Sequence, residues 1–289
     1  MVSSRDYHGA VSGIDLHAHT IYSDGTFTPA EAIALAVDRG LSVLSISDHD
    51  STEGLREAEA AAEATPVEVV PGVELSAVHD GGPVHLLCYW PDLGAEELQG
   101  ELRRLREDRW TRGRRMVEKL QSLGYPVTFE RVSEIAEGDN VGRPHLAQAL
   151  VEAGVVPELK DAFSDELIGT GGRAYVEKHA LPSLDALALV KRAGGIAVLA
   201  HPGLRWRREL PVPDDLIERM AEAGLDGLEV DHPDHDALAR VRYREMAHRL
   251  GLVATGSSDC HGTRYDPVRM GSETTDPQEF ARLKARKGL

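Results

Sequence analysis

The chain has 289 residues, 42% of them hydrophobic, and a formal net charge of −16 at pH 7. This size suits one large domain or a domain with an insertion, and the acidic balance argues against a broad non-specific nucleic-acid surface. No apolar run approaches the roughly 18 residues of a membrane span, and residues 1–13 lack the apolar segment of a signal peptide. Cys88 and Cys260 form no C-x-x-C pair, which fits a reducing compartment. We therefore expect a cytoplasmic protein, with no membrane or protein partner evident.

Strand and helix patterns alternate along most of the chain. Residues 28–40, TPAEAIALAVDRG, predict a helix, because Thr28 is a suitable N-cap, Pro29 suits the first helical position and Gly40 ends the apolar stripe. Short apolar segments predict seven strands, at residues 14–16, 41–47, 67–76, 84–90, 195–201, 224–232 and 251–259. The alternation implies parallel strands in an α/β fold, and this number of strands suggests a closed or nearly closed barrel.

The rhythm of strands and helices breaks between residues 92 and 183. Apolar residues from Leu98 to Leu123 recur at helical spacing, and no convincing strand pattern appears in this region. A helical insertion on a barrel loop explains this most simply, and such insertions commonly cover active sites. We therefore expect residues 1–91 and 184–289 to form the barrel and residues 92–183 to form a covering insertion.

Side chains that can bind metal gather where the predicted strands end. They are His17, His19, Asp24, Asp48, His49, Asp50, Glu74, His85, His201, Asp259 and His261. A single histidine at such a place is more often a packing residue, but packing explains so many poorly, because buried charges are costly unless paired or coordinated. Strand ends share one rim in a parallel α/β barrel, so we expect the side chains to converge there. Their nitrogen and carboxylate donors suit Mn, Fe or Zn.

Five motifs, in this order, resemble the PHP (polymerase and histidinol phosphatase) domain: DLHAHTIYSDG, ISDHD, GVE, AHP and SDCHG. The resemblance implies a distorted seven-stranded (βα)7 barrel and two to three divalent metal ions, for which we expect Mn²⁺ first, with Fe or Zn as alternatives. By motif, it assigns one ion to His17, His19, Glu74 and Asp259, a second to Glu74, His85 and His201, and a third to Asp24, His49 and His261.

Two segments of the insertion resemble a PHP subgroup that removes the 3′-phosphate from nucleoside 3′,5′-bisphosphates and whose relatives trim RNA from the 5′ end. They are NVGRPHLAQALVEAG (140–154) and AYVEK (174–178). The resemblance implies that Arg143 and His145 face the metals and hold substrate phosphate, and a guanidinium suits phosphate oxygens. We add Lys178 as a further candidate for an anion pocket with these two residues. His145 is also a candidate proton donor to the leaving oxygen. The alternative is a plain helix start at Pro144 with solvated neighbours.

Two further candidate substrate residues are Arg205 and His235. Relatives often read A-H-P-G-R after the fifth strand, whereas here Leu204 follows Gly203 and the arginine is displaced to position 205. His235, in DHPDHD, lies near where the subgroup has a polar residue on the substrate side. The arginine-rich run from Arg103 to Arg115 is expected to be a solvated helix face, with an electrostatic guide for an oligonucleotide as the alternative.

Together these features predict a metal-dependent phosphoesterase. The expected reaction converts a nucleoside 3′,5′-bisphosphate to the nucleoside 5′-monophosphate and phosphate, with stepwise trimming of short 5′-phosphorylated RNA as an extension. The alternatives are a histidinol-phosphate-type phosphatase, an amidohydrolase that cleaves C–N bonds, and a non-catalytic metal-binding module associated with nucleic-acid enzymes. The amidohydrolase is disfavoured because the lysine in VKRAGG lies in a predicted helix and not at a strand end.

Overall fold

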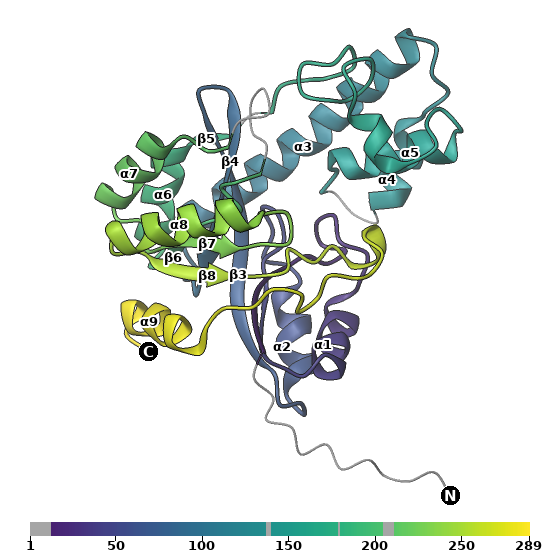
Figure 1. The fold of residues 1–289 in the computed structure, drawn as a ribbon. Helices are drawn as coiled ribbons and strands as arrows, with labels where there is room; N and C mark the ends of the chain where they lie inside the picture. Colours follow the sequence, from purple (N-terminus) through teal and green to yellow (C-terminus); the bar gives the residue numbers. More distant parts are fainter. Residues whose placement is uncertain (1–12, 137–139, 179, 205–210) are drawn as a thin grey trace, which may run out of the picture.

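The computed structural model describes residues 13–136, 140–178, 180–204 and 211–289. Figure 1 shows a sheet with helices packed against it and a group of helices, including α4 and α5, that stands beyond one end of the sheet. Arg205 and most of the N-terminal segment considered above lie outside the described residues. Within the described ranges, no helix combines the length and apolar character needed to cross a bilayer.

The strands are β1 (Gly13–Ala18), β2 (Leu41–Ile46), β3 (Glu68–His79), β4 (Gly82–Tyr89), β5 (Leu181–Pro182), β6 (Ile196–Leu199), β7 (Gly227–Asp231) and β8 (Val253–Gly256). The α-helices are α1 (Pro29–Asp38), α2 (Leu55–Ala62), α3 (Glu96–Ser122), α4 (Phe129–Ala136), α5 (Arg143–Glu152), α6 (Ser183–Arg192), α7 (Asp214–Glu222), α8 (Ala237–Arg249) and α9 (Pro277–Lys287). Short 3₁₀ helices occupy Leu159–Phe163 (η1) and Gly262–Arg264 (η3).

The start of α1 shows how local sequence defines an element. The Glu31 N–H donates to the Thr28 hydroxyl at 3.2 Å, and the Thr28 N–H donates to the Glu31 carboxylate at 2.8 Å. This reciprocal pair is a capping box, and Pro29 follows it in the first helical turn. The helix predicted from residue 28 is confirmed.

The sheet runs in the order β1-β2-β3-β4-β6-β7-β8, and β5 pairs with β3 beside this path. The fold is α/β and mostly parallel, as predicted, but within the described ranges the sheet has eight strands and not seven. The extra strand, β5, has two residues and pairs in parallel with Ala77 and Val78. It was missed because two residues are too short for a period to show in the sequence.

Strand β4 corrects the expectation that all strands are parallel, because it runs antiparallel to both β3 and β6. The cause is the connection between β3 and β4, where His79 pairs with Gly82 and only Asp80 and Gly81 intervene. Both intervening residues have positive φ angles, 47° and 75°. An Asp-Gly pair with positive φ at both positions is the preferred two-residue hairpin turn, so this dipeptide reverses the chain.

The first and last strands of the sheet approach each other without forming a continuous ladder. A single parallel bridge joins Ala18 to Cys260. The His19 N–H donates to the Cys260 carbonyl at 2.8 Å, and the Cys260 N–H donates to the His17 carbonyl at 3.3 Å. These bonds bring the segments that follow β1 and β8 side by side, whereas closure of the barrel stays a prediction.

Helix α3 connects two separate groups of buried apolar residues. Near its N-terminus, Leu98, Leu102 and Leu105 pack with residues of β3, β4 and α6. Near its C-terminus, Met116 and Leu120 pack with residues of α4, α5 and the segment up to residue 176. The division into a barrel of residues 1–91 and 184–289 and an insertion of residues 92–183 stays a prediction, supported by this second core.

The hairpin between β3 and β4 can be tested with two glycines whose backbone conformations differ. Gly81→Ala should lower the free energy of unfolding by about 1–2 kcal/mol, because an alanine is strained at its φ of 75°. Gly100→Ala is the matched control, since Gly100 lies within α3 and a Cβ there meets only Arg103 Nη2 at 3.9 Å. It should raise stability by about 0.5–1 kcal/mol. Urea denaturation followed by circular dichroism measures both changes, and equal shifts would contradict the assigned turn.

Candidate metal centre

The predicted ligands converge at the carboxyl ends of β1, β2, β6 and β8. His19 and Asp24 follow β1, His201 follows β6, and Asp259 and His261 follow β8. His49 follows β2 and forms a parallel bridge with Glu74, which lies inside the long strand β3. Because β4 is antiparallel, His85 reaches the cluster from within the strand, opposite Ser76, and not from a carboxyl end.

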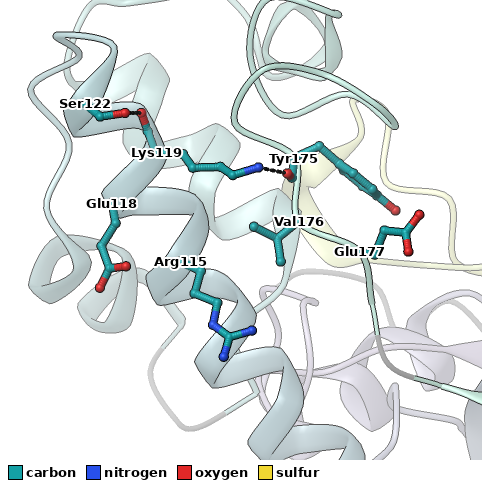
Figure 2. Close-up of a pocket in the computed structure, with 7 residues that line it drawn as sticks. All are labelled: Arg115, Glu118, Lys119, Ser122, Tyr175, Val176 and Glu177. Carbon is teal, nitrogen blue, oxygen red and sulfur yellow. Dashed lines mark hydrogen bonds between the residues drawn. The ribbon is translucent and has the colours of Figure 1, made fainter.

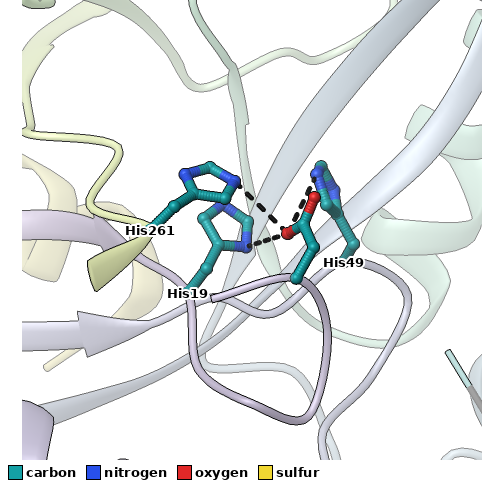
Figure 3. A group of neighbouring side chains, drawn as sticks. His19, His49 and His261 are labelled. Atoms are coloured by element: carbon teal, nitrogen blue, oxygen red, sulfur yellow. Dashed lines mark ion pairs between the residues drawn. The ribbon is translucent and has the colours of Figure 1, made fainter. Parts of the chain in front are cut away.

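The side chains form three groups whose ligand atoms lie within 4.8 Å of one another. The groups are His17, His19, Glu74 and Asp259; His19, Asp24, His49 and His261; and His49, Glu74 and His85. Figure 3 shows His19, His49 and His261 of the second group turned toward a shared carboxylate. His201 joins through its Nε2 atom, 2.9 Å from Glu74 Oε1. The ligand roles of these nine residues stay predictions that this convergence supports.

The distances in the first group fit a bound cation. The Nε2 atoms of His17 and His19 lie 3.1 Å apart, and each is 3.2 Å from Glu74 Oε2. Asp259 Oδ1 lies 3.3 Å from the first nitrogen and 3.2 Å from the second. Ligands bonded at 2.0–2.1 Å to a tetrahedral ion are separated by about 3.3 Å. The four atoms are therefore already spaced as one ion requires.

Several buried polar atoms at the centre make no well-directed hydrogen bond among the described residues and contact other predicted ligands at 2.8–3.3 Å instead. They are Asp24 Oδ1, His49 Nδ1, Glu74 Oε2, His85 Nδ1 and Asp259 Oδ1. Native proteins leave few buried polar atoms unsatisfied, and a group of them in one place indicates a ligand. All five belong to residues that the sequence assigned to metal, so the donor set fits divalent ions.

The charges within the cluster keep its carboxylates ionised. Burial alone raises the pKa of Glu74, but the surrounding histidines, His49 first, lower it well below the usual range. The same opposition acts on Asp24, where burial is outweighed by His261 and His49, and its pKa falls well below normal. Ionised carboxylates in a buried site are the ligands that a divalent cation needs.

Four further acidic residues hold the ligands in place from outside the cluster. Glu229 Oε1 lies 3.1 Å from His17 Nδ1, and its Oε2 accepts the His201 N–H at 2.6 Å. Asp15 accepts from the Ser258 N–H at 3.0 Å and so positions the segment that carries Asp259. A carboxylate on the outer nitrogen of a metal-binding histidine fixes the ring and its tautomer. Asp15 and Glu229 are not among the side chains predicted from the sequence, because both lie inside strands.

Asp48 and Asp50, which also follow β2, act in the same supporting way. Asp48 accepts from the Thr20 N–H at 2.7 Å and from the Ser23 hydroxyl at 2.5 Å, which fixes the loop that carries Asp24. Asp50 accepts from the Ser76 N–H at 2.7 Å and from the Ser76 hydroxyl at 2.7 Å. These carboxylates are satisfied by the protein, unlike those at the centre.

A cavity of about 270 Å³ opens beside the cluster and is lined by several cations. Asp24, His49 and His85 form part of its wall, together with Arg109, Arg112, Arg143 and Lys178. Burial and the neighbouring Arg109 lower the pKa of Lys178 to about 7, although Asp50 acts in the opposite direction. We call this cavity the cationic pocket.

The interpretation of residues 103–115 as a solvated helix face is wrong for three of the seven arginines. Arg106, Arg109 and Arg112 recur every three residues, and each is only 9% exposed. Arg109 Nε donates to Asp50 Oδ2 at 2.8 Å, Arg106 donates to the Asp50 carbonyl at 2.8 Å, and Arg112 donates to the Val176 carbonyl at 2.7 Å. Arg106 and Arg109 are buried because they bind Asp50. The spacing of residues along the helix does not reveal this partner.

Arg143 and His145 lie at the start of α5, as the helix-start alternative proposed, but they are not freely solvated. The Arg143 guanidinium lies 5.5 Å from the Phe163 ring centre and 5.8 Å from that of Tyr175, and donates to Thr170 Oγ1 at 3.3 Å. His145 is 2% exposed, and its Nδ1 accepts the Gly142 N–H at 3.0 Å. The helix start is therefore confirmed, whereas the roles of Arg143 and His145 in holding substrate phosphate stay predictions.

His235 is bonded within the protein through both ring nitrogens. Its Nε2 accepts the Gly203 N–H at 3.0 Å, and its Nδ1 donates to the Val230 carbonyl at 2.8 Å. We therefore leave His235 out of the proposed substrate site. Arg205 lies outside the described residues.

A shallow groove of about 590 Å³ runs along the far part of α3 and meets the cationic pocket at Tyr175 and Glu177. Figure 2 shows Arg115, Glu118 and Lys119 on the helix, with Lys119 directed at the main chain of Tyr175. The Lys119 Nζ donates to the Tyr175 carbonyl at 2.6 Å. The groove and the cationic pocket are therefore neighbours at these two residues.

Comparison with known proteins agrees with the motifs. The PHP domain model matches residues 15–137. The 3′,5′-nucleoside bisphosphate phosphatase of Chromobacterium violaceum is 34% identical over 253 residues, covering 87% of this chain and 88% of that protein. The phosphoribosyl 1,2-cyclic phosphate 1,2-diphosphodiesterase of Eggerthella lenta is also 34% identical, covering 86% and 94%.

The 5′-3′ exoribonuclease Rnm of Salmonella typhimurium is 30% identical, covering 86% of this chain and 84% of that protein. A crystal structure from Bifidobacterium adolescentis, described as a metal-dependent phosphoesterase, superposes with a TM-score of 0.89 at 36% identity and covers 95% of this chain and 96% of that one. The chain therefore belongs to the PHP-domain family. Within this family the chain is a metal-dependent phosphoester hydrolase. This finding argues against the alternative of a non-catalytic metal-binding module.

Loss of one ligand should separate metal binding from folding. Protein purified without chelator should carry about two to three equivalents of divalent transition metal, since the ligands form three groups. In chelated protein, Mn²⁺ at a hundred times its Kd should stabilise the fold by about 2.7 kcal/mol, measured as a rise in Tm. His17→Ala should lose most of this rise and the turnover while remaining folded.

His248→Ala is the matched control, because this histidine is exposed on α8. It should keep the Mn²⁺ response and the turnover of the wild type. Elemental analysis that finds no metal, with no gain of activity on adding Mn²⁺, would contradict the metal assignment.

Proposed function

We propose that the protein hydrolyses the 3′-phosphate of nucleoside 3′,5′-bisphosphates and releases the nucleoside 5′-monophosphate and phosphate. The observation that carries this proposal is the cationic pocket, whose wall joins predicted metal ligands to Arg109, Arg112, Arg143 and Lys178. A substrate with two phosphates can place one at the cluster and the other among these cations. The name of the Chromobacterium violaceum relative supports the same substrate class.

The proposed cofactors are two to three divalent ions, with Mn²⁺ preferred and Fe or Zn as alternatives. The residues that would hold them are His17, His19, Asp24, His49, Glu74, His85, His201, Asp259 and His261. When bound, such ions supply Lewis-acid stabilisation of phosphoryl oxygens and make a nucleophile available from water near neutral pH. The protein contributes the positions of the ligands and of the groups that bind the substrate.

Arg143 is the proposed anchor for the second phosphate. Two aromatic rings and the Thr170 hydroxyl hold its guanidinium before substrate arrives. A guanidinium binds phosphate with two parallel hydrogen bonds, and less entropy is lost when its orientation is already fixed. Lys178 adds a second positive charge when it is protonated.

His145 is the proposed hydrogen-bond donor to the phosphoryl or leaving oxygen. Because its Nδ1 accepts the Gly142 N–H, its proton lies on Nε2. A neutral imidazole donates a hydrogen bond but transfers its remaining proton poorly, so this arrangement favours a binding role over the general-acid role considered from sequence. Burial lowers its pKa to about 4, which agrees with a neutral ring.

The structure also disfavours the amidohydrolase alternative. Lys191 of VKRAGG lies in α6, as predicted, and its Nζ donates to Asp226 Oδ2 at 2.7 Å. It is therefore paired outside the cluster and does not serve as a metal-bridging carbamate. The histidinol-phosphate alternative is tested by the substrate comparison below.

Substrates that lack the second phosphate should be poor. Hydrogen bonds to charged groups contribute roughly 1.5–3 kcal/mol each, so kcat/KM for 3′-AMP should be about ten- to more than a hundredfold below that for adenosine 3′,5′-bisphosphate. Arg143→Ala should reduce this difference in kcat/KM, because it should lower kcat/KM for the bisphosphate more than kcat/KM for 3′-AMP. Initial rates of phosphate release with Mn²⁺ measure both effects. Equal rates on the two nucleotides, or a preference for histidinol phosphate, would overturn the substrate assignment.

The proposed role of Lys178 predicts a pH dependence. With a pKa of about 7, the lysine is charged below that pH and neutral above it. An anionic substrate binds the charged form better, so kcat/KM for the bisphosphate should fall as the pH rises through about 7. Lys178→Arg should remove this fall, because arginine stays charged, whereas Lys178→Met should lower kcat/KM on the acidic side. An unchanged profile in Lys178→Arg would contradict the assignment.

Trimming of short 5′-phosphorylated RNA is a second candidate function, favoured by the groove of Figure 2 and by the name of the Salmonella typhimurium relative. We place it second because Arg115 and Lys119 share the groove with Glu118 and Glu177, which weakens its attraction for a polyanion.

Salt dependence separates the two functions. If RNA follows the groove, its hydrolysis should decline steeply between 50 and 200 mM salt, because several phosphates then release counterions, and the rate on adenosine 3′,5′-bisphosphate should decline little. Arg115→Ala should reduce the rate on RNA only. If the rates on the two substrates declined equally with salt, binding of RNA in the groove would be contradicted.

A further inference from the structure

A second cavity, of about 660 Å³, has a more apolar wall than the cationic pocket. Its apolar and aromatic lining residues are Pro144, Val151, Pro157, Leu159, Phe163 and Tyr265. Polar groups of Glu158, Lys160, His261 and Arg264 complete the wall. It shares Pro144 and Phe163 with the cationic pocket. We call it the aromatic cavity.

The aromatic cavity adjoins the predicted metal centre at His261. This histidine lines the cavity, and its Nε2 lies 3.3 Å from Asp24 Oδ1, an atom at the centre of the second ligand group. Asp24 in turn lines the cationic pocket. The cluster therefore has a cationic cavity and an aromatic cavity as neighbours.

Two exposed aromatic rings face this cavity. Among the described residues with large, exposed apolar side chains, Phe163 and Tyr265 are the aromatic ones, 40% and 38% exposed, and both line it. Exposed aromatic rings beside a catalytic centre are costly in water and indicate a binding surface.

Each ring is held by an arginine on one of its faces. The Arg269 guanidinium lies 3.6 Å from the Tyr265 ring centre, and Asp234 fixes it through two hydrogen bonds of 2.8 and 3.0 Å. Arg143 lies 5.5 Å from the Phe163 ring centre. A ring supported in this way is oriented before a ligand binds, which limits the entropy lost on stacking.

We infer that the aromatic cavity is the nucleobase subsite, in which the flat base stacks on Phe163 and Tyr265 while the sugar phosphates occupy the cluster and the cationic pocket. The inference rests on the proposed function and gives the base of the substrate a binding place in addition to those of its two phosphates. Stacking on aromatic side chains tolerates any base, so the subsite distinguishes nucleotides from simple sugar phosphates without selecting one base.

The test compares adenosine 3′,5′-bisphosphate with 1-deoxyribose 3,5-bisphosphate, which carries hydrogen in place of the base. Wild-type kcat/KM should be about ten- to a hundredfold higher for the nucleotide, as expected for stacked bases. Phe163→Leu and Tyr265→Leu should each reduce this ratio at least about threefold, and Tyr265→Phe, which keeps the ring, should preserve it. Leu238→Ala, 82% exposed on α8, is the control and should behave as wild type.

The outcomes distinguish the subsite from the proposed function. Similar wild-type rates on both bisphosphates would overturn the nucleobase subsite and leave the bisphosphatase assignment standing. A ratio unchanged in both leucine variants would also overturn the subsite. If wild-type protein with Mn²⁺ hydrolyses neither bisphosphate, the proposed function fails and the inference fails with it.

Discussion

Three buried carboxylates gathered in one cluster of histidines are the constraint on which the rest of the structure depends. Asp24, Glu74 and Asp259 are all at most 8% exposed, and their charges converge among buried histidines. Like charges repel strongly where water is excluded, and burial adds a desolvation cost to each. Divalent cations offset both effects, so the strands, loops and insertion can be understood as a frame for bound metal.

The acidic residues of this frame have two different roles: some are predicted to bind metal, and others hold the predicted ligands in position. Those at the centre have oxygen atoms that contact only at ion-pair distance the histidines of the cluster, without a well-directed hydrogen bond. Asp15, Asp48, Asp50 and Glu229 are instead hydrogen-bonded to backbone, hydroxyl, imidazole or guanidinium groups. The Asp50 carboxylate also orients Arg109, and so it links the metal cluster to the cationic pocket. The two cavities flank this frame and give a substrate distinct places for charge and for an aromatic ring.

The sequence predicts the ligands better than their surroundings. The convergence of histidines and carboxylates at strand ends can be inferred from the sequence alone, because the carboxyl ends of parallel strands meet at one rim. Glu229 lies inside a strand, and the inward arginines of α3 depend on Asp50, a partner that lies 59 residues from Arg109. Such contacts depend on tertiary packing. The antiparallel strand β4 is different, because the Asp80–Gly81 dipeptide is a hairpin signal in the sequence.

Diffraction from crystals grown with Mn²⁺, recorded at the manganese absorption edge, tests the central claim most directly. The account predicts an anomalous peak enclosed by His17, His19, Glu74 and Asp259, and further peaks between Asp24, His49 and His261 and beside Glu74 and His85. Crystals that diffract well and show no anomalous peak within reach of Glu74, or metal bound only at other sites, would contradict it.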